Sequence, residues 1–226
     1  MTLGTLDWIA IGCWIVVVII TAGIFIKLFL KYLKYPERVK NRLAFCLVFL
    51  FLVIGRCLLI YFDYFLVELD TTRYGEFQMM WKMATLFQLM GIGFLIVVSE
   101  YAVFNGKDYY VFFIGFTIVV FIGLLIQDFL LAQNITVGAL GFLAFIPISW
   151  IYLIRKLPET RNNMLMILMG FIIYGGGLLI ISAGLVPIIE DIFLISVHEI
   201  YLISPLIQIP GLLILGLGIK RMYFAD

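Results

Sequence analysis

The chain alternates between long apolar runs and short segments that hold most of its charged and turn-forming residues. Each run is long enough to cross the roughly 30 Å hydrocarbon core of a bilayer as a helix, which takes about 20 residues. A helix also satisfies its own backbone hydrogen bonds in lipid. The pattern predicts an all-α, single-domain bundle (1–226) of seven transmembrane helices, at about 8–33, 43–66, 79–104, 110–131, 137–157, 164–188 and 200–220.

Composition supports a membrane protein. Of the 226 residues, 65% are hydrophobic and 13% are charged, whereas soluble domains hold about 45–50% apolar residues. The net charge of +1 gives no reason to expect nucleic acid as a partner. The expected partner is the lipid bilayer, and the expected location is the cell membrane, which the chain crosses several times.

The basic residues predict the orientation of the bundle. Lysine and arginine gather in the segments after the first, third, fifth and seventh runs, whereas acidic residues dominate the segments at the other end. Cytoplasmic loops are enriched in lysine and arginine, so the amino terminus is expected outside and the carboxyl terminus inside. The basic inner loops are also where a cytoplasmic protein partner would bind.

Arg56 stands within the apolar stretch FLVIGRCLLIYFDYF, residues 51–65. It lies about 20 Å along the helix from the inner end of its run, and a charge at this depth must face protein or water. Gln88, Tyr174 and Gln208 fall at a similar depth in their own runs. The sequence thus predicts a polar midplane pocket in which Arg56 anchors a ligand carboxylate or phosphate and the other three orient the ligand. The same groups could instead only hold the helices together.

The seventh run contains the residues expected to make the pocket mobile. Pro205 and Pro210 flank Gln208, and each proline removes a helical hydrogen bond. We therefore expect the helix to be interrupted here and able to move.

Three further carboxylates lie near predicted helix ends. Asp63 and Asp128 would form an outer vestibule that attracts cations, or they would simply be solvated helix ends. Glu100 would act as an inner latch by pairing with Lys107 or with an arginine of an inner loop. An ordinary interfacial glutamate is the alternative.

No enzyme, metal centre or cofactor is expected from the residues. Cys13, Cys46 and Cys57 lie within apolar runs and show no CxxC spacing. The only histidine, His198, stands beside Glu199 in what is expected to be an outer loop, without a ligand set around it. No combination of nucleophile and base is visible either.

The predicted layout resembles that of microbial rhodopsins and other seven-helix sensors. The stretch SPLIQIPGLLILGLG, residues 204–218, holds no lysine for a retinal Schiff base, and Lys220 is at the inner end. The chain is more similar to uncharacterised seven-helix sensor-type membrane proteins of prokaryotes. That resemblance implies sensing of a small or lipid-like ligand, with a signal passed to the inner surface. Small sugar facilitators of three-plus-one-plus-three helices are similar in length and orientation, and they imply a small-solute transporter or channel as the alternative.

Overall fold

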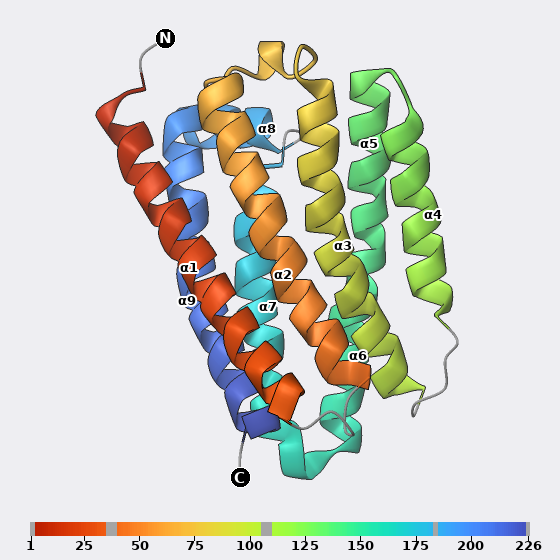
Figure 1. Cartoon of the computed structure of the whole chain (residues 1–226). Coiled ribbons are helices and arrows are strands. Elements are labelled where there is room, and N and C mark those ends of the chain that lie inside the picture. Colours follow the sequence, from red (N-terminus) through yellow and green to blue (C-terminus); the bar gives the residue numbers. More distant parts are fainter. Residues whose placement is uncertain (1–2, 35–39, 105–109, 183–184, 225–226) are drawn as a thin grey trace. The chain divides into compact units, whose positions relative to one another are not determined.

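The computed structural model describes residues 3–34, 40–104, 110–182 and 185–224, and this part of the chain contains helices but no strands (Figure 1). The predicted all-α class is therefore confirmed. A π-helical segment, η2 (Tyr61–Leu66), directly continues α2, and a 3-10 segment, η4 (Leu140–Ala144), joins α5 to α6. The helices are α1 (Thr5–Lys34), α2 (Lys40–Ile60), α3 (Gln78–Val103), α4 (Val111–Leu125), α5 (Phe129–Ala139), α6 (Phe145–Lys156), α7 (Arg161–Ile180), α8 (Val186–Phe193) and α9 (Val197–Phe224).

Six helical stretches of the described chain are long and apolar enough to cross a membrane. Helix α4 is equally apolar in character but has only 15 residues. Large apolar side chains such as Ile19 and Ile148 are 63% exposed, which suits contact with lipid rather than water. The chain is thus a multi-pass membrane protein, and its six stretches are Thr5–Lys34, Leu43–Leu66, Gln78–Val103, Leu131–Lys156, Pro158–Ile180 and Val197–Met222.

The border between the predicted fourth and fifth runs differs in the structure. Helix α4 ends at Leu125 and does not fill the predicted range 110–131. The next helix starts at Phe129, earlier than the predicted 137–157. The turn between them is fixed by Asp128, whose carboxylate accepts a hydrogen bond of 2.8 Å from the backbone amide three residues on. An aspartate directly before an apolar run is a sequence signal for such a start.

The last two runs also differ from the prediction. Helix α7 ends at Ile180 rather than near 188, and a separate short helix, α8, begins with Pro187 in its first turn. Helix α9 already begins at Val197, and the interruption expected in it is absent. It remains helical through Pro205 and Pro210, so that expectation was wrong.

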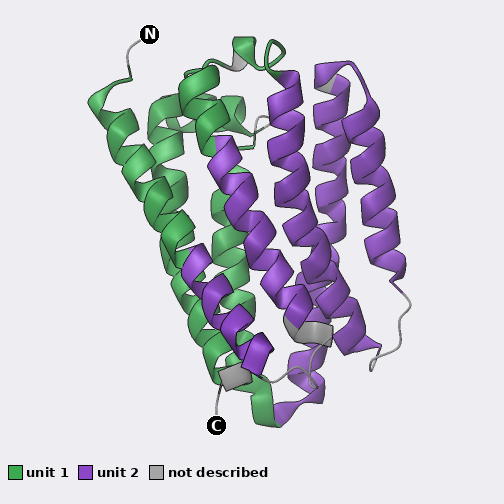
Figure 2. Ribbon diagram, in the orientation of Figure 1, with its two compact units in different colours: residues 1–20, 60–77, 159–226 green, residues 21–59, 78–158 purple. Residues whose placement is uncertain are grey.

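The structure divides into two compact units (Figure 2). Unit 1 comprises residues 1–20, 60–77 and 159–226, and unit 2 comprises residues 21–59 and 78–158. Helix α1 contributes to both, because the division falls between residues 20 and 21.

Close packing of α7 against α9 organises unit 1. A Cβ atom added to Gly211 of α9 would lie 2.6 Å from the backbone nitrogen of Tyr174 in α7, closer than real Cβ contacts allow. Gly170 of α7 meets the backbone of Leu215 in the same way. Glycine at these positions lets the two backbones approach directly, the usual basis of tight helix pairs in membranes.

In unit 2, α3 is the central helix. A Cβ atom at Gly55 of α2 would lie 2.6 Å from the backbone nitrogen of Gln88 in α3, so these two helices also touch through a glycine. Trp150 of α6 donates from its ring nitrogen to the hydroxyl of Ser99 in α3, at 3.1 Å. These contacts fix the buried face of α3 on which Gln88 lies.

Candidate functional site

The four residues predicted to build the pocket are divided between the units. Arg56 and Gln88 belong to unit 2, whereas Tyr174 and Gln208 belong to unit 1. All four side chains are buried, with Arg56 3% and Gln208 0% exposed. The predicted meeting of all four residues stays a prediction.

The unit 1 pair lies where α7 and α9 touch. The Gln208 Nε2 donates to the Ser204 hydroxyl at 2.9 Å, and that hydroxyl donates to the backbone carbonyl of Gly177 at 2.7 Å. A side chain on Gly177 would collide with the Cγ of Gln208, at 2.6 Å, so the glycine makes room for the amide. The Gln208 Oε1 is buried and has no hydrogen-bond partner among the described residues. Tyr174 lies three residues before Gly177 and is also buried.

In unit 2, Gln88 is also a buried amide whose polar atoms lack hydrogen-bond partners among the described residues. Its amide is 8% exposed, and neither its Oε1 nor its Nε2 has a hydrogen-bond partner among the residues that the structure describes. The missing side chain of Gly55 leaves space beside this amide, because a Cβ there would lie 3.0 Å from the Gln88 Oε1. An unpaired buried amide costs about 1–3 kcal/mol, so a native structure normally keeps one only for a reason.

Helix α9 carries a row of polar side chains along one face, and all of them except the half-exposed His198 are buried. The row consists of His198, Tyr201, Ser204 and Gln208, spaced three, three and four residues apart. This spacing places side chains on one face of a helix. Only Gln208 was predicted as part of a site, although the helical spacing of the other three was a readable signal. We call these four residues the polar row of α9.

Asp63 meets the polar row within unit 1. It lies in the π-helical segment η2, is buried, and faces the hydroxyls of Tyr74 and Tyr201, at 3.4 and 3.5 Å from its Oδ1. The two hydroxyls are 3.0 Å apart. Burial, and then the charge of Asp63, raise the pKa of Tyr74 well above its usual range. π-Helical turns are rare and occur often at functional sites.

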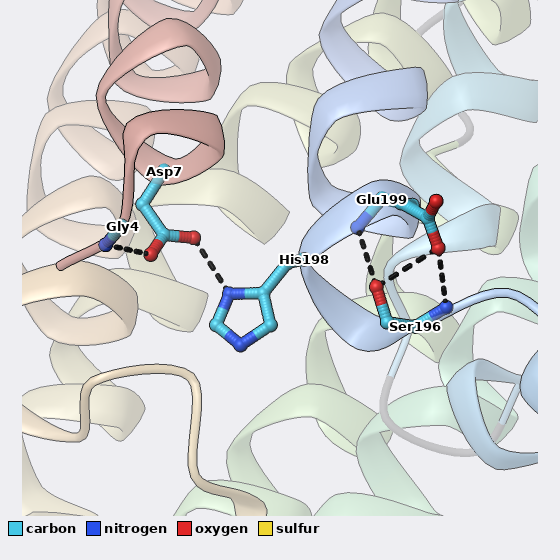
Figure 3. A network of polar contacts seen from close by, with 5 residues as sticks. All are labelled: Gly4, Asp7, Ser196, His198 and Glu199. Carbon is cyan, nitrogen blue, oxygen red and sulfur yellow. Dashed lines mark hydrogen bonds and ion pairs between the residues drawn. The ribbon is translucent and has the colours of Figure 1, made fainter.

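At the start of α9, the polar row is held by a histidine and an aspartate (Figure 3). The His198 Nδ1 lies 2.6 Å from the Oδ1 of Asp7 in α1, and the other oxygen of Asp7 accepts from the backbone nitrogen of Gly4 at 2.8 Å. The sequence predicted a loop position for His198, but the residue stands in the first turn of α9. Nothing in the sequence signals this pairing, because the two residues are 191 positions apart.

Glu199, next to His198, has a different role (Figure 3). Its carboxylate accepts from the backbone nitrogen and the hydroxyl of Ser196, at 2.7 and 2.9 Å. The Glu199 backbone nitrogen in turn points to that hydroxyl at 3.4 Å. Ser-x-x-Glu at a helix start is a capping box, which explains why α9 begins at Val197.

The two residues predicted as an outer vestibule lie in different units. Asp63 is buried in unit 1, as described above, and Asp128 is an exposed N-cap in unit 2. The vestibule itself stays a prediction.

Glu100, the predicted latch, caps a helix. Its buried carboxylate accepts hydrogen bonds from the backbone nitrogens of Phe112 and Phe113, at 2.7 and 3.1 Å, in the first turn of α4. At the other end of α4, Lys82 donates to the carbonyl of Ile126 at 2.5 Å. A negative group at the start of a helix and a positive group at its end both match the helix dipole. Lys107, the predicted partner of Glu100, lies outside the described residues.

No group of three or more metal-ligating side chains that could hold a metal ion lies within the described ranges. Comparison of the chain with protein-family models, with curated proteins and with solved structures finds no match.

Proposed function

We propose that the protein is a cell-membrane sensor that binds a small ligand through buried polar side chains of its helices. The observation that carries the proposal is Gln208. Its side chain is fully buried, its nitrogen is held by Ser204, and its oxygen lacks a partner among the described residues. A chain that keeps such a group in a membrane loses stability unless a ligand or an ordered water completes the hydrogen bond.

Other residues would assist within their own units. Tyr174 lies in α7, where Gly211 of α9, three residues after Gln208, packs against its backbone. In unit 2, Gln88 would offer a second amide, and Arg56 would attract a carboxylate or phosphate group of a ligand. The polar row of α9 would lead from the half-exposed His198 towards Gln208.

Seven crossings with the amino terminus outside are part of the proposal. Fifteen residues make α4 about 22 Å long, which is short for a crossing, but bilayers thin locally around short helices. The caps supplied by Glu100 and Lys82 neutralise both ends of α4 and so suit a helix that ends close to lipid. The basic segments would then face the cytoplasm, where a signalling partner would bind.

Transport of a small solute is the second candidate. Pro205 and Pro210 lie on either side of Gln208 within a continuous helix, and each removes one backbone hydrogen bond. Helices weakened in this way next to a buried polar residue can bend during alternating access.

The experiment begins with purified protein in lipid nanodiscs, screened against a library of small metabolites for compounds that raise its unfolding temperature. A compound that stabilises the wild type but not Gln208→Met supports the proposal. Gln127→Met is the matched control, because Gln127 is exposed and its side chain has no role in the site. If no compound shows a dependence on Gln208, the proposed binding function is wrong.

Each compound found is then tested in proteoliposomes. Binding without uptake or counterflow indicates a sensor, whereas counterflow that Gln208→Met abolishes indicates a transporter.

A further inference from the structure

The orientation of the Gln208 amide is fixed by its neighbours, and this fixes what kind of ligand group it can accept. The carbonyl of Gly177 can only accept a hydrogen bond, so the Ser204 hydroxyl must donate to it. That hydroxyl has one proton, so it must accept from Gln208, and only the Nε2 of the amide can donate. The amide therefore cannot be turned round without breaking this chain of hydrogen bonds. The atom left without a partner is the oxygen Oε1, which is an acceptor.

Backbone chemistry adds a further acceptor on the same helix face. Pro205 has no backbone N–H, so it cannot donate to the carbonyl of Tyr201 one turn earlier. Tyr201 and Pro205 are both buried, as Gln208 is. The carbonyl of Tyr201 therefore lacks its usual helical donor.

We propose that the ligand of this site presents an N–H or O–H donor to the Gln208 Oε1, so that binding through this oxygen favours ammonium or hydroxyl compounds over groups that only accept. This inference rests on the proposed function and names the chemical class of its ligand. An ordered water in place of a ligand is the competing explanation, because water can also donate to an amide oxygen.

Four small probes separate hydrogen-bond donation from charge. Propylammonium is a cation with N–H donors, 1-propanol is a neutral donor, tetramethylammonium is a cation without a donor, and propionate is an acceptor only. Binding of each probe to the protein in nanodiscs is followed by saturation-transfer NMR. The signal that counts is the difference between the wild type and Gln208→Met, which removes the amide but keeps a side chain of similar length.

A dependence on Gln208 for propylammonium or 1-propanol, with none for the other two probes, is the expected result. Loss of one hydrogen bond corresponds to binding that is weaker by about 3- to 10-fold. Comparison of the two donor probes shows whether the natural group is an ammonium or a hydroxyl. A dependence on Gln208 for propionate or tetramethylammonium alone overturns the inference but leaves the proposed binding function standing. No dependence for any probe means that the site holds water only, and this also overturns the inference.

Ser204→Ala provides a second, independent test. This variant keeps Gln208 but removes the hydroxyl that orients its amide, so the amide can turn and offer its nitrogen. The preference for propylammonium over propionate should then fall by several-fold, while Gln208 remains necessary for binding. If the preference is unchanged in Ser204→Ala, the amide is not oriented by Ser204 and the inference fails.

Discussion

At the scale of single residues, buried polar side chains in this protein mostly serve backbone groups. Glu100 shows this clearly. A carboxylate that is 1% exposed accepts from two backbone nitrogens of another helix, where the N-cap residue Tyr110 makes no side-chain cap of its own. A charge that the sequence suggested for a conformational latch therefore supports the start of α4.

Replacement of Glu100 by glutamine should lower the free energy of unfolding by about 1–3 kcal/mol. The amide has one accepting oxygen in place of two and no charge to match the helix dipole. Thermal and chemical unfolding in detergent measure the change. Glu159→Gln, at an exposed position, is the control and should change stability little. Equal stability of the two variants would show that Glu100 does not cap α4.

Glycine contacts are the second feature at this scale. Gly211→Ala should destabilise the protein by about 1–3 kcal/mol, because its Cβ would meet the backbone of Tyr174 and the helices would have to separate. Gly175→Ala is the matched control in α7, since nothing lies within 4 Å of its Cβ position. Unfolding of both variants in the same detergent provides the comparison. If Gly211→Ala proves as mild as Gly175→Ala, then α7 and α9 do not pack as closely as the structure shows.

At the scale of elements, the helix starts are set by side chains that the sequence displays. Asp128 begins α5, and the Ser196–Glu199 pair begins α9. Both are ordinary N-terminal signals, and they place the two helix starts earlier than the apolar runs do.

Ser196→Ala should therefore loosen the first turn of α9. Amide hydrogen exchange of residues 198–201 is expected to become faster by about fivefold, in keeping with the loss of one N-cap. Ser196→Asp keeps an accepting oxygen and should exchange like the wild type. If the aspartate variant exchanges as fast as the alanine variant, the capping box is not what holds this turn.

The segment from η2 to Tyr74 should respond to alkaline pH. The pKa of Tyr74 is raised in the folded protein, so above pH 10 the folded state binds more protons than the unfolded state, and stability must fall as pH rises. The contribution of the raised Tyr74 pKa to the stability of the fold is fully present below about pH 10. Unfolding of the wild type between pH 8 and about pH 11 should show the decline, and Tyr74→Phe should show a smaller one. Tyr61→Phe, at an exposed position, should follow the wild type.

At the scale of the whole molecule, the multi-pass character was predictable, and the number of crossings depends on α4. Six stretches satisfy the length and hydropathy expected of a crossing, and α4 satisfies hydropathy alone. The distribution of basic residues predicts one side for the segments after the first, third, fifth and seventh runs.

Reporter fusions test this topology directly. With seven crossings and an external amino terminus, a fluorescent protein fused after Asp226 should fold in the cytoplasm and fluoresce. Alkaline phosphatase fused after Gln127 should be active, because the end of α4 would lie outside. If α4 does not cross, six crossings remain and both ends of α4 lie on one side of the membrane. Equal activity of phosphatase fused after Lys107 and after Gln127, or a carboxyl terminus that does not fluoresce, would show this.

The sequence by itself determined the helical class, the membrane environment and the approximate position of the helices. These depend on local properties, since the length and hydropathy of a run decide whether it can replace water by lipid. It also placed Gln88 and Gln208 at a similar depth in their runs, because depth along a helix can be counted. Only the tertiary structure decided which polar groups meet, as in Asp7 with His198, Asp63 with Tyr74 and Tyr201, and Glu100 with the start of α4. Those partners are separated by up to 191 positions, and a hydrogen bond depends on distances of a few ångströms that no local pattern encodes.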